Sequence, residues 1–199
     1  MLILVRHGRT ALNAAGRLQG RVDAELDDVG VEQARRIAAA VSSAERVVSS
    51  PLLRARQTAE ALGMRVEIDD RWIELDYGDL DGKPVAEVGA EVWAQWRVDL
   101  DYVPAGGESL AALNRRVVGA CEELLPVFAT IDLVVVSHVS PIKAAVAWAL
   151  GAGAEVGWRS HLDQASITRI GVSGRGPILR SFNETTHLGV SPGPARISG

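Results

Sequence analysis

The sequence predicts an α/β protein of three layers, α/β/α, with a mainly parallel central sheet and an antiparallel edge strand. Short apolar runs alternate with helical patterns along most of the chain. The run LVVV at 133–136 is unbroken and β-branched, which is typical of a strand buried in a parallel sheet. Near the C-terminus, SGRG at 173–176 separates two strand-like runs and predicts a hairpin, which supplies the antiparallel edge.

In chain order, the first third of the sequence predicts three strands and two helices. Asp27 and Asp28 precede the first helical pattern, and proline at position 51 suits the first turn of the second helix. Gly63 is expected to stop that second helix. The strands are expected at 2–5, 46–49 and 65–68, and the helices at 31–41 and 50–62.

The remainder of the chain predicts three helices and three strands. Ser140-Pro141 repeats the serine-proline start of a helix, and Gly151 is expected to end that helix. Residues 191–199 are expected to form a frayed tail. The helices are expected near 84–98, 110–128 and 140–150, and the strands at 133–136, 166–172 and 177–182.

Length and composition indicate one globular domain over residues 1–199. The net charge of −4 gives no sign of a nucleic-acid-binding protein. A single cysteine, Cys121, excludes an intramolecular disulfide. The first apolar run is too short for a signal peptide, and no stretch is long and apolar enough to span a membrane, so we expect a cytoplasmic protein. The oligomeric state stays open, a dimer included.

Three polar clusters follow predicted strands. They are Arg6-His7-Gly8, the pair Ser49-Ser50 leading to Arg54, and Ser137-His138. In open α/β sheets, ligands bind at the carboxyl ends of the strands. We therefore expect two imidazoles and two guanidiniums to meet in a cationic pocket, which suits a phosphate dianion.

Such a pocket supports phosphoryl transfer. A neutral imidazole beside cations can attack phosphorus, because the neighbouring charge lowers its pKa and leaves a lone pair available. Water would then hydrolyse the phosphohistidine, while the guanidiniums stabilise the transferring oxygens. A nearby carboxylic acid would protonate the leaving alkoxide. No cluster of His, Cys and Asp has the spacing of metal ligands, so neither a metal nor another cofactor is expected.

With these residues, the chain resembles branch 1 of the histidine phosphatase superfamily, also called phosphoglycerate mutase-like. Its R-H-G-x-T motif matches residues 6–10, and its S-x-L-x-R-A-x-x-T-A pattern matches 50–59. The acid motif matches ELDYGDLDG, which begins at Glu74, and VVSHVSP carries the second histidine. GRLQG at 16–20 resembles the phosphate loop, and FNETTHL a C-terminal signature of small members.

The resemblance implies roles for individual residues. His7 would be the nucleophile, with Arg6, Arg54 and His138 holding the phosphoryl group and Glu74 donating the proton. The resemblance also implies a helical insertion over the site. The further residues implied to bind phosphate or substrate are Gly8, Arg9, Thr10, Asn13, Gln19, Gly20 and Val139.

Two residues depart from the family's pattern. Arg9 stands where the family usually has Glu or Gln, and it would either add positive charge at the mouth of the site or pair with an acidic residue. Val139 replaces the glycine of the usual S-H-G motif. Its N–H can still reach a phosphate, but valine disfavours positive φ and would narrow the pocket.

Several aromatic residues and histidines allow more than one interpretation. Trp72, Trp93 and Trp96 would form either an apolar wall over the site or part of the core, whereas Trp148 and Trp158 are assigned to packing. His161 is interpreted as structural or solvated, and His187 as a residue that pins the C-terminal segment.

The leading functional hypothesis is a metal-independent phosphomonoesterase that acts on a small phosphorylated metabolite, with no nucleic-acid or membrane partner. The alternatives are a cofactor-dependent phosphoglycerate mutase and a noncatalytic binder of a phosphorylated ligand. The acid motif differs from the E-R-x-Y-G form of mutases, and the stretch 74–108 is short, so the phosphatase is favoured. The sequence does not identify the substrate.

Overall fold

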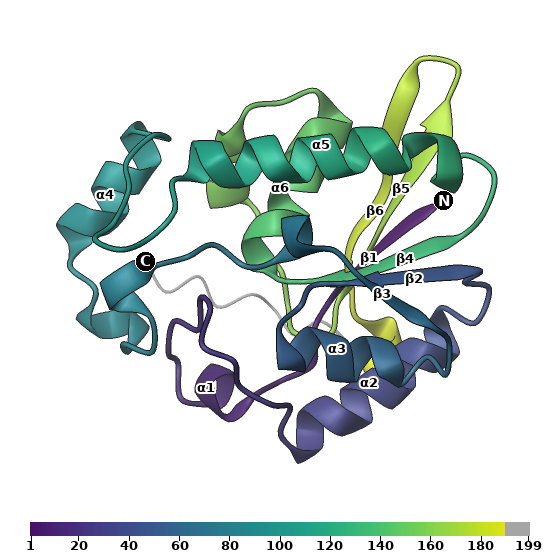
Figure 1. Ribbon diagram of the computed structural model, residues 1–199, viewed down its shortest axis with the longest axis horizontal. Helices are drawn as coiled ribbons and strands as arrows, with labels where there is room; N and C mark the ends of the chain where they lie inside the picture. Colours follow the sequence, from purple (N-terminus) through teal and green to yellow (C-terminus); the bar gives the residue numbers. More distant parts are fainter. Residues whose placement is uncertain (190–199) are drawn as a thin grey trace.

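The computed structural model describes residues 1–189 and consists of a six-stranded sheet between two helical layers (Figure 1). The expected tail at 191–199 lies outside the described residues. The strands are β1 (Leu2–Arg6), β2 (Arg46–Ser49), β3 (Val66–Ile68), β4 (Leu133–Ser137), β5 (Ile167–Ser173) and β6 (Gly176–Glu184). The α-helices are α1 (Ala11–Ala14), α2 (Asp28–Ala40), α3 (Leu53–Glu60), α4 (Ala90–Val98), α5 (Leu110–Phe128) and α6 (Val139–Leu150).

The sheet order is β3-β2-β4-β1-β5-β6, which confirms the predicted fold class. The first four strands in this order are parallel, and the β5–β6 hairpin completes the sheet through antiparallel pairing. Five short 3₁₀-helices occupy the connections, at Asp70–Trp72, Gly78–Leu80, Val85–Glu87, Ala154–Arg159 and Thr186–Leu188.

Alternate residues of the central strands divide the core into two clusters, one on each face of the sheet. Leu2 and Leu4 pack on the side of α5 and α6, whereas Ile3 and Val5 pack on the side of α2 and α3. The β4 residues Leu133–Ser137 are buried throughout, as the continuous apolar run predicts. Helices therefore cover both faces of the sheet, so polar side chains that could bind a ligand are expected at the ends of the strands.

Helix starts differ most from the predicted elements. The Asp27 side chain accepts a hydrogen bond from Gly30 N (2.8 Å), so α2 begins three residues before the predicted start at Val31. By contrast, α3 begins only at Leu53, because Ser50 N still bonds to Val136 O (3.0 Å) and prolongs the β2–β4 pairing. The helical pattern near 84–98 divides at Gly89 into a 3₁₀ turn and α4.

One short helix, α1, was not predicted from the apolar pattern. It is closed by a capping box, in which the side chains of Thr10 and Asn13 each bond to the other's backbone N–H. Within residues 1–189, none of the helices combines the length and the apolar character that crossing a membrane requires.

Candidate active site

The strand register brings the two candidate histidines together. In the parallel pair β1–β4, Arg6 lies opposite Ser137, so His7 and His138 leave adjacent strands at the same level. His7 N bonds to Ser137 O (3.0 Å), and the two imidazole centroids are 5.0 Å apart. The two segments that carry these histidines therefore meet at the carboxyl edge of the sheet.

The hydrogen bonds of His7 fix its tautomer. Nδ1 lies 2.7 Å from the carbonyl oxygen of Gly8, which can only accept, so Nδ1 carries the proton. Nε2 therefore keeps its lone pair, and it accepts a hydrogen bond from Nε of Arg54 (3.2 Å). Burial, followed by the charges of Arg54 and Arg6, lowers the pKa of His7 well below 6.5. The ring is thus a neutral imidazole whose free nitrogen faces a guanidinium.

Arg54 is completely buried and is held by backbone carbonyls. Its Nη1 donates to Val22 O (2.7 Å) and its Nη2 to Gly20 O (2.8 Å), so the guanidinium ties α3 to the loop after α1. Thr58, one helical turn later, donates to Arg54 O (2.7 Å) and accepts from Gly8 N (3.0 Å). The role of Thr58 was not predicted, although its i+4 spacing from Arg54 places it on the same face of α3.

Two buried polar atoms at this edge have no hydrogen-bond partner among residues 1–189. They are Nε of Arg6 and Nδ1 of His138. The other ring nitrogen of His138, Nε2, forms a hydrogen bond with Ser50 Oγ (2.7 Å). Burial, followed by the charge of Arg54, lowers the pKa of His138 well below 6.5. Buried polar groups normally have partners, and Nε of Arg6 can only donate, so this edge is suited to a ligand that offers hydrogen-bond acceptors.

Glu74 lies between the 3₁₀-helices at 70–72 and 78–80, and its carboxyl group contacts the N-terminus of α6, which follows His138. Oε1 accepts from the backbone N–H groups of Leu75 (2.8 Å) and Ser140 (3.2 Å), while Oε2 accepts from that of Val139 (3.1 Å). Oε2 therefore has more free lone-pair capacity than Oε1. Val139 is the first residue of the right-handed helix α6, so its replacement of glycine requires no positive φ.

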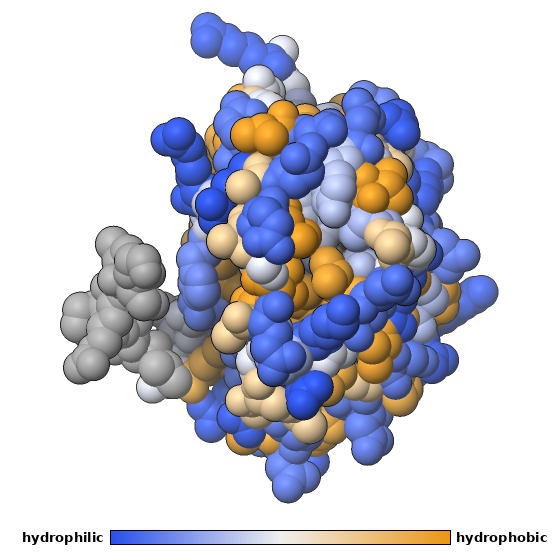
Figure 2. Space-filling view, turned by 90° about the vertical axis from the view of Figure 1, so that its left-hand side faces the viewer, coloured by the Kyte–Doolittle hydropathy of each residue, from blue (hydrophilic) through white to orange (hydrophobic). Residues whose placement is uncertain are grey.

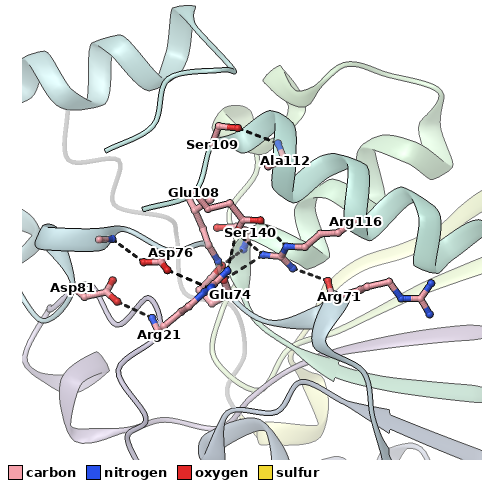
Figure 3. Close-up of polar contacts among 12 residues, drawn as sticks. Arg21, Arg71, Glu74, Asp76, Asp81, Glu108, Ser109, Ala112, Arg116 and Ser140 are labelled. Carbon is pink, nitrogen blue, oxygen red and sulfur yellow. Dashed lines mark hydrogen bonds and ion pairs between the residues drawn. The ribbon is translucent and has the colours of Figure 1, made fainter. Parts of the chain in front are cut away.

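A layer of ion pairs supports the segment that carries Glu74 (Figure 3). Arg116 of α5 binds Glu108 (Nε–Oε1, 2.8 Å) and donates to the backbone carbonyls of Arg71 (2.6 Å) and Glu74 (3.3 Å). Arg21 reaches the same Glu108 (3.4 Å). The network connects α5 and the loop after α1 to the carboxylate segment, which has little regular structure of its own.

The remaining predicted residues form the loop around His7. Gly8 packs so closely on Gly30 that a methyl group added at position 8 would lie 2.5 Å from Gly30 O. Thr10 Oγ1 lies 3.0 Å from Gln19 Oε1 and accepts from Asn13 N (3.2 Å), so these three residues stiffen the loop. Gly20 adopts φ +46 and supplies a carbonyl to Arg54, as described above.

Arg9 is directed to an acidic partner. Its Nε lies 2.8 Å from Asp27 Oδ2, and its backbone N–H donates to the Gln33 side chain (2.8 Å). Of the two alternatives raised by the sequence, the geometry agrees with pairing. Arg9 thus anchors the loop to the start of α2.

The tryptophans divide between core and cavity. Trp72 and Trp96 are both buried in the core, and Trp93 packs against it. Trp93 and Trp96 also line a cavity that includes Leu75, the residue after Glu74. Trp158, which the sequence assigned to packing, also lines this cavity.

His187 donates to Ala165 O (2.9 Å), as expected of a residue that pins the C-terminal segment, and His161 is exposed. In residues 1–189, no three His, Cys, Asp or Glu side chains cluster as metal ligands would.

The two buried histidines predict a pH dependence of stability. In the unfolded chain, each imidazole takes up a proton as the pH falls below about 6.5. The folded protein keeps His7 and His138 neutral to a much lower pH. The unfolded state then binds more protons, so stability falls as the pH decreases, with a slope of up to about 1.4 kcal/mol per pH unit for each histidine.

Urea unfolding at a series of pH values checks this expectation. The free energy of unfolding should be level above about pH 7 and fall by about 2 kcal/mol between about pH 6.5 and 5.5. His161→Ala is the matched control, because that side chain is 81% exposed and its loss should leave the profile unchanged. A flat profile down to about pH 5 would contradict the assignment of two buried neutral imidazoles.

Comparisons with known proteins agree with this geometry. The family model described as histidine phosphatase superfamily (branch 1) matches residues 2–185. A phosphoserine phosphatase 1 from Hydrogenobacter thermophilus is 36% identical over 198 residues, with 94% of each chain covered. The crystal structure of a phosphoserine phosphatase mutant from Entamoeba histolytica, in complex with phosphoserine, superposes with a TM-score of 0.86 at 28% identity. That match covers 94% of this chain and 98% of the other.

A further relative is longer. A protein of Mycobacterium tuberculosis described as bifunctional is 39% identical over 179 residues, which are 84% of this chain. The match covers 49% of the mycobacterial protein, so this chain spans about half the length of that relative.

Proposed function

Because the chain belongs to branch 1 of the histidine phosphatase superfamily, we propose that it is a metal-independent phosphomonoesterase that acts on a small phosphorylated metabolite through a phosphohistidine. The observation that carries the proposal is the state of His7. Its proton is held on Nδ1 by Gly8 O, and its Nε2 lone pair faces the guanidinium of Arg54. A neutral, oriented nitrogen among fixed cations is what attack on a phosphate dianion requires.

In the first step, Nε2 of His7 attacks phosphorus and the bond to the ester oxygen breaks. The oxygens of the phosphoryl group displace Nε2 as the partner of Arg54 and occupy the unpartnered positions at Arg6 and His138. Arg54, Arg6 and His138 stabilise the charge on the phosphoryl oxygens, mainly because they are held in fixed positions around them. A proton on Oε2 of Glu74 passes to the leaving oxygen, so that the alcohol departs neutral.

In the second step, the Glu74 carboxylate takes a proton from water, and the resulting hydroxide attacks the phosphohistidine. The phosphorus–nitrogen bond breaks, its electron pair returns to Nε2, and inorganic phosphate leaves. His7 returns to the neutral form favoured by its burial and its cationic neighbours. The cycle consumes one water per ester, and the charge stabilisation comes from side chains of this chain.

Phosphate release in the presence of EDTA tests the proposal. We expect turnover of 4-nitrophenyl phosphate and of phosphoserine without added metal. In a separate assay without EDTA, which would chelate vanadate, we expect inhibition by vanadate, because it mimics the transferring phosphoryl group. Phosphoserine is chosen because two similar proteins are named for its hydrolysis. Interconversion of 2- and 3-phosphoglycerate that needs a bisphosphoglycerate primer would instead indicate the mutase. Tight phosphate-ester binding with no release from a broad panel would indicate the noncatalytic binder.

A further inference from the structure

A mainly apolar cavity of about 130 Å³ lies at the start of α6, and Leu75, the residue after Glu74, is part of its lining. It is lined by three indole rings together with leucine and valine side chains: Trp93, Trp96, Trp158, Leu110, Leu113 and Val139. An apolar cavity of about 150 Å³ is large enough to bind benzene. At about 130 Å³ the present cavity is slightly smaller, so one aromatic ring or a branched alkyl group of similar size would fill it.

The proton donor and the cavity share a wall. Oε2 of Glu74 accepts from Val139 N (3.1 Å), and the next residue, Leu75, also lines the cavity. In the proposed reaction the leaving oxygen must contact Glu74 to receive a proton, so the carbon bonded to that oxygen lies on the same side. The alcohol portion of the substrate would therefore lie near Leu75, Val139 and Ser140, which bond to the Glu74 carboxyl group through their backbone N–H groups and line the cavity.

The indole rings form a connected, partly open wall. The ring centroids of Trp93 and Trp96 are 5.5 Å apart, and those of Trp93 and Trp158 are 6.5 Å apart in an edge-on arrangement. The Arg97 guanidinium lies over the Trp158 ring, with Cζ 5.6 Å from the ring centroid. Figure 2 faces the side of the molecule where α4 lies and shows a patch of aliphatic residues, in orange, among hydrophilic ones. The indole wall favours flat, apolar groups.

Two polar groups at the cavity have unused donor capacity. The indole N–H of Trp96 is buried and has no partner among the described residues, and Trp96 is only 1% exposed. Lys143 donates to Gly157 O (2.8 Å), which leaves two of its N–H bonds. An acceptor atom on the bound group could pair with Lys143, whereas the Trp96 N–H is enclosed by protein atoms.

We propose that the physiological substrate is a phosphomonoester whose alcohol carries an aromatic or similarly bulky apolar group, with this cavity as its binding site. The inference rests on the proposed function and names the class of its leaving group. A compact, doubly charged alcohol such as serine would leave the indole wall unfilled. Lys143 could pair with the carboxylate of serine, but the ammonium group of serine would lie against the indole wall beside another cation, which is costly without a partner.

Paired alkyl phosphates isolate the contribution of the cavity. Ethyl phosphate and 2-phenylethyl phosphate both release primary alcohols, so a difference in kcat/KM reports binding of the phenyl group and not leaving-group reactivity. We expect a preference of about tenfold or more for the phenylethyl ester. Trp158→Ala should reduce this ratio to within about threefold of unity, and Trp158→Phe should largely keep it.

Val98→Ala is the matched control, because Val98 ends the helix of Trp93 and Trp96 but is 81% exposed. It should keep the wild-type ratio. Equal kcat/KM for the two esters in the wild type, or an unchanged ratio in Trp158→Ala, would overturn the inference while the phosphatase proposal stands. Failure to hydrolyse these esters, 4-nitrophenyl phosphate and phosphoserine would instead remove the proposed function and the inference together.

Discussion

Replacing His7 with alanine is expected to lower kcat/KM for phosphomonoesters by about 10⁴-fold or more. The reason is that Nε2 of His7 is a neutral imidazole nitrogen with a free lone pair, oriented by Gly8 and facing Arg54. The other imidazole at this edge belongs to His138. Its Nε2 forms a hydrogen bond with Ser50 Oγ, and its ring centroid lies 5.0 Å from that of His7. It is not placed to substitute as nucleophile.

Two measurements distinguish loss of the nucleophile from loss of the fold. The His7→Ala protein should still bind vanadate or phosphate, because the guanidiniums of Arg6 and Arg54 remain. Rapid quenching of the wild type with substrate should trap an acid-labile phosphoryl group that the variant lacks. His161→Ala is the matched control and should retain wild-type turnover, since His161 is exposed and bonds only to Asp163 among the described residues. Residual turnover in His7→Ala above a few per cent of wild type would exclude His7 as the nucleophile.

The sheet and the gathering of the cationic residues could be predicted because both follow from local patterns. Buried parallel strands read as continuous apolar runs, and the strands at 2–5, 46–49 and 133–136 agree with the structure to within one residue. Once strand ends are known, the topology of an α/β sheet places polar residues such as His7 and His138 at one edge. The position of Arg54 at the same edge could also be predicted, because its helix α3 comes directly after strand β2.

The surroundings of Glu74 could not be predicted, because they depend on contacts between irregular segments. The stretch from Asp69 to Asp81 contains two 3₁₀ turns, and its position is fixed by Arg116 on a helix more than thirty residues later. No periodic signal reports such a contact. The cavity wall is equally non-local, since Trp93 and Trp158 come from separate segments, and a tryptophan lining a cavity has the same sequence signal as one in the core.

Glu74→Gln is expected to lower kcat for alkyl phosphates by about 10²- to 10⁴-fold, with much less effect on 4-nitrophenyl phosphate. An alkoxide is a poor leaving group and needs a proton, whereas nitrophenolate is stable as an anion at neutral pH. The carboxyl group can supply that proton from Oε2 while Oε1 keeps its two backbone partners, Leu75 N and Ser140 N. The amide of glutamine can keep the same two bonds through its oxygen, but its NH2 group cannot accept from Val139 N and has no acidic proton to transfer.

The difference between the two substrates separates acid catalysis from a structural role. If Glu74 only anchored the start of α6 through Val139 and Ser140, its substitution would disturb His138 as well and slow both substrates alike. Thermal unfolding of Glu74→Gln controls for a loss of the anchor. Arg116→Lys offers a second comparison, because Arg116 holds the carbonyl of Glu74 but does not touch its carboxyl group. Its effect should therefore be similar for the two substrates, whereas the effect of Glu74→Gln should grow as the leaving alcohol becomes less acidic. Equal losses with alkyl and nitrophenyl esters in Glu74→Gln would assign the proton to another group.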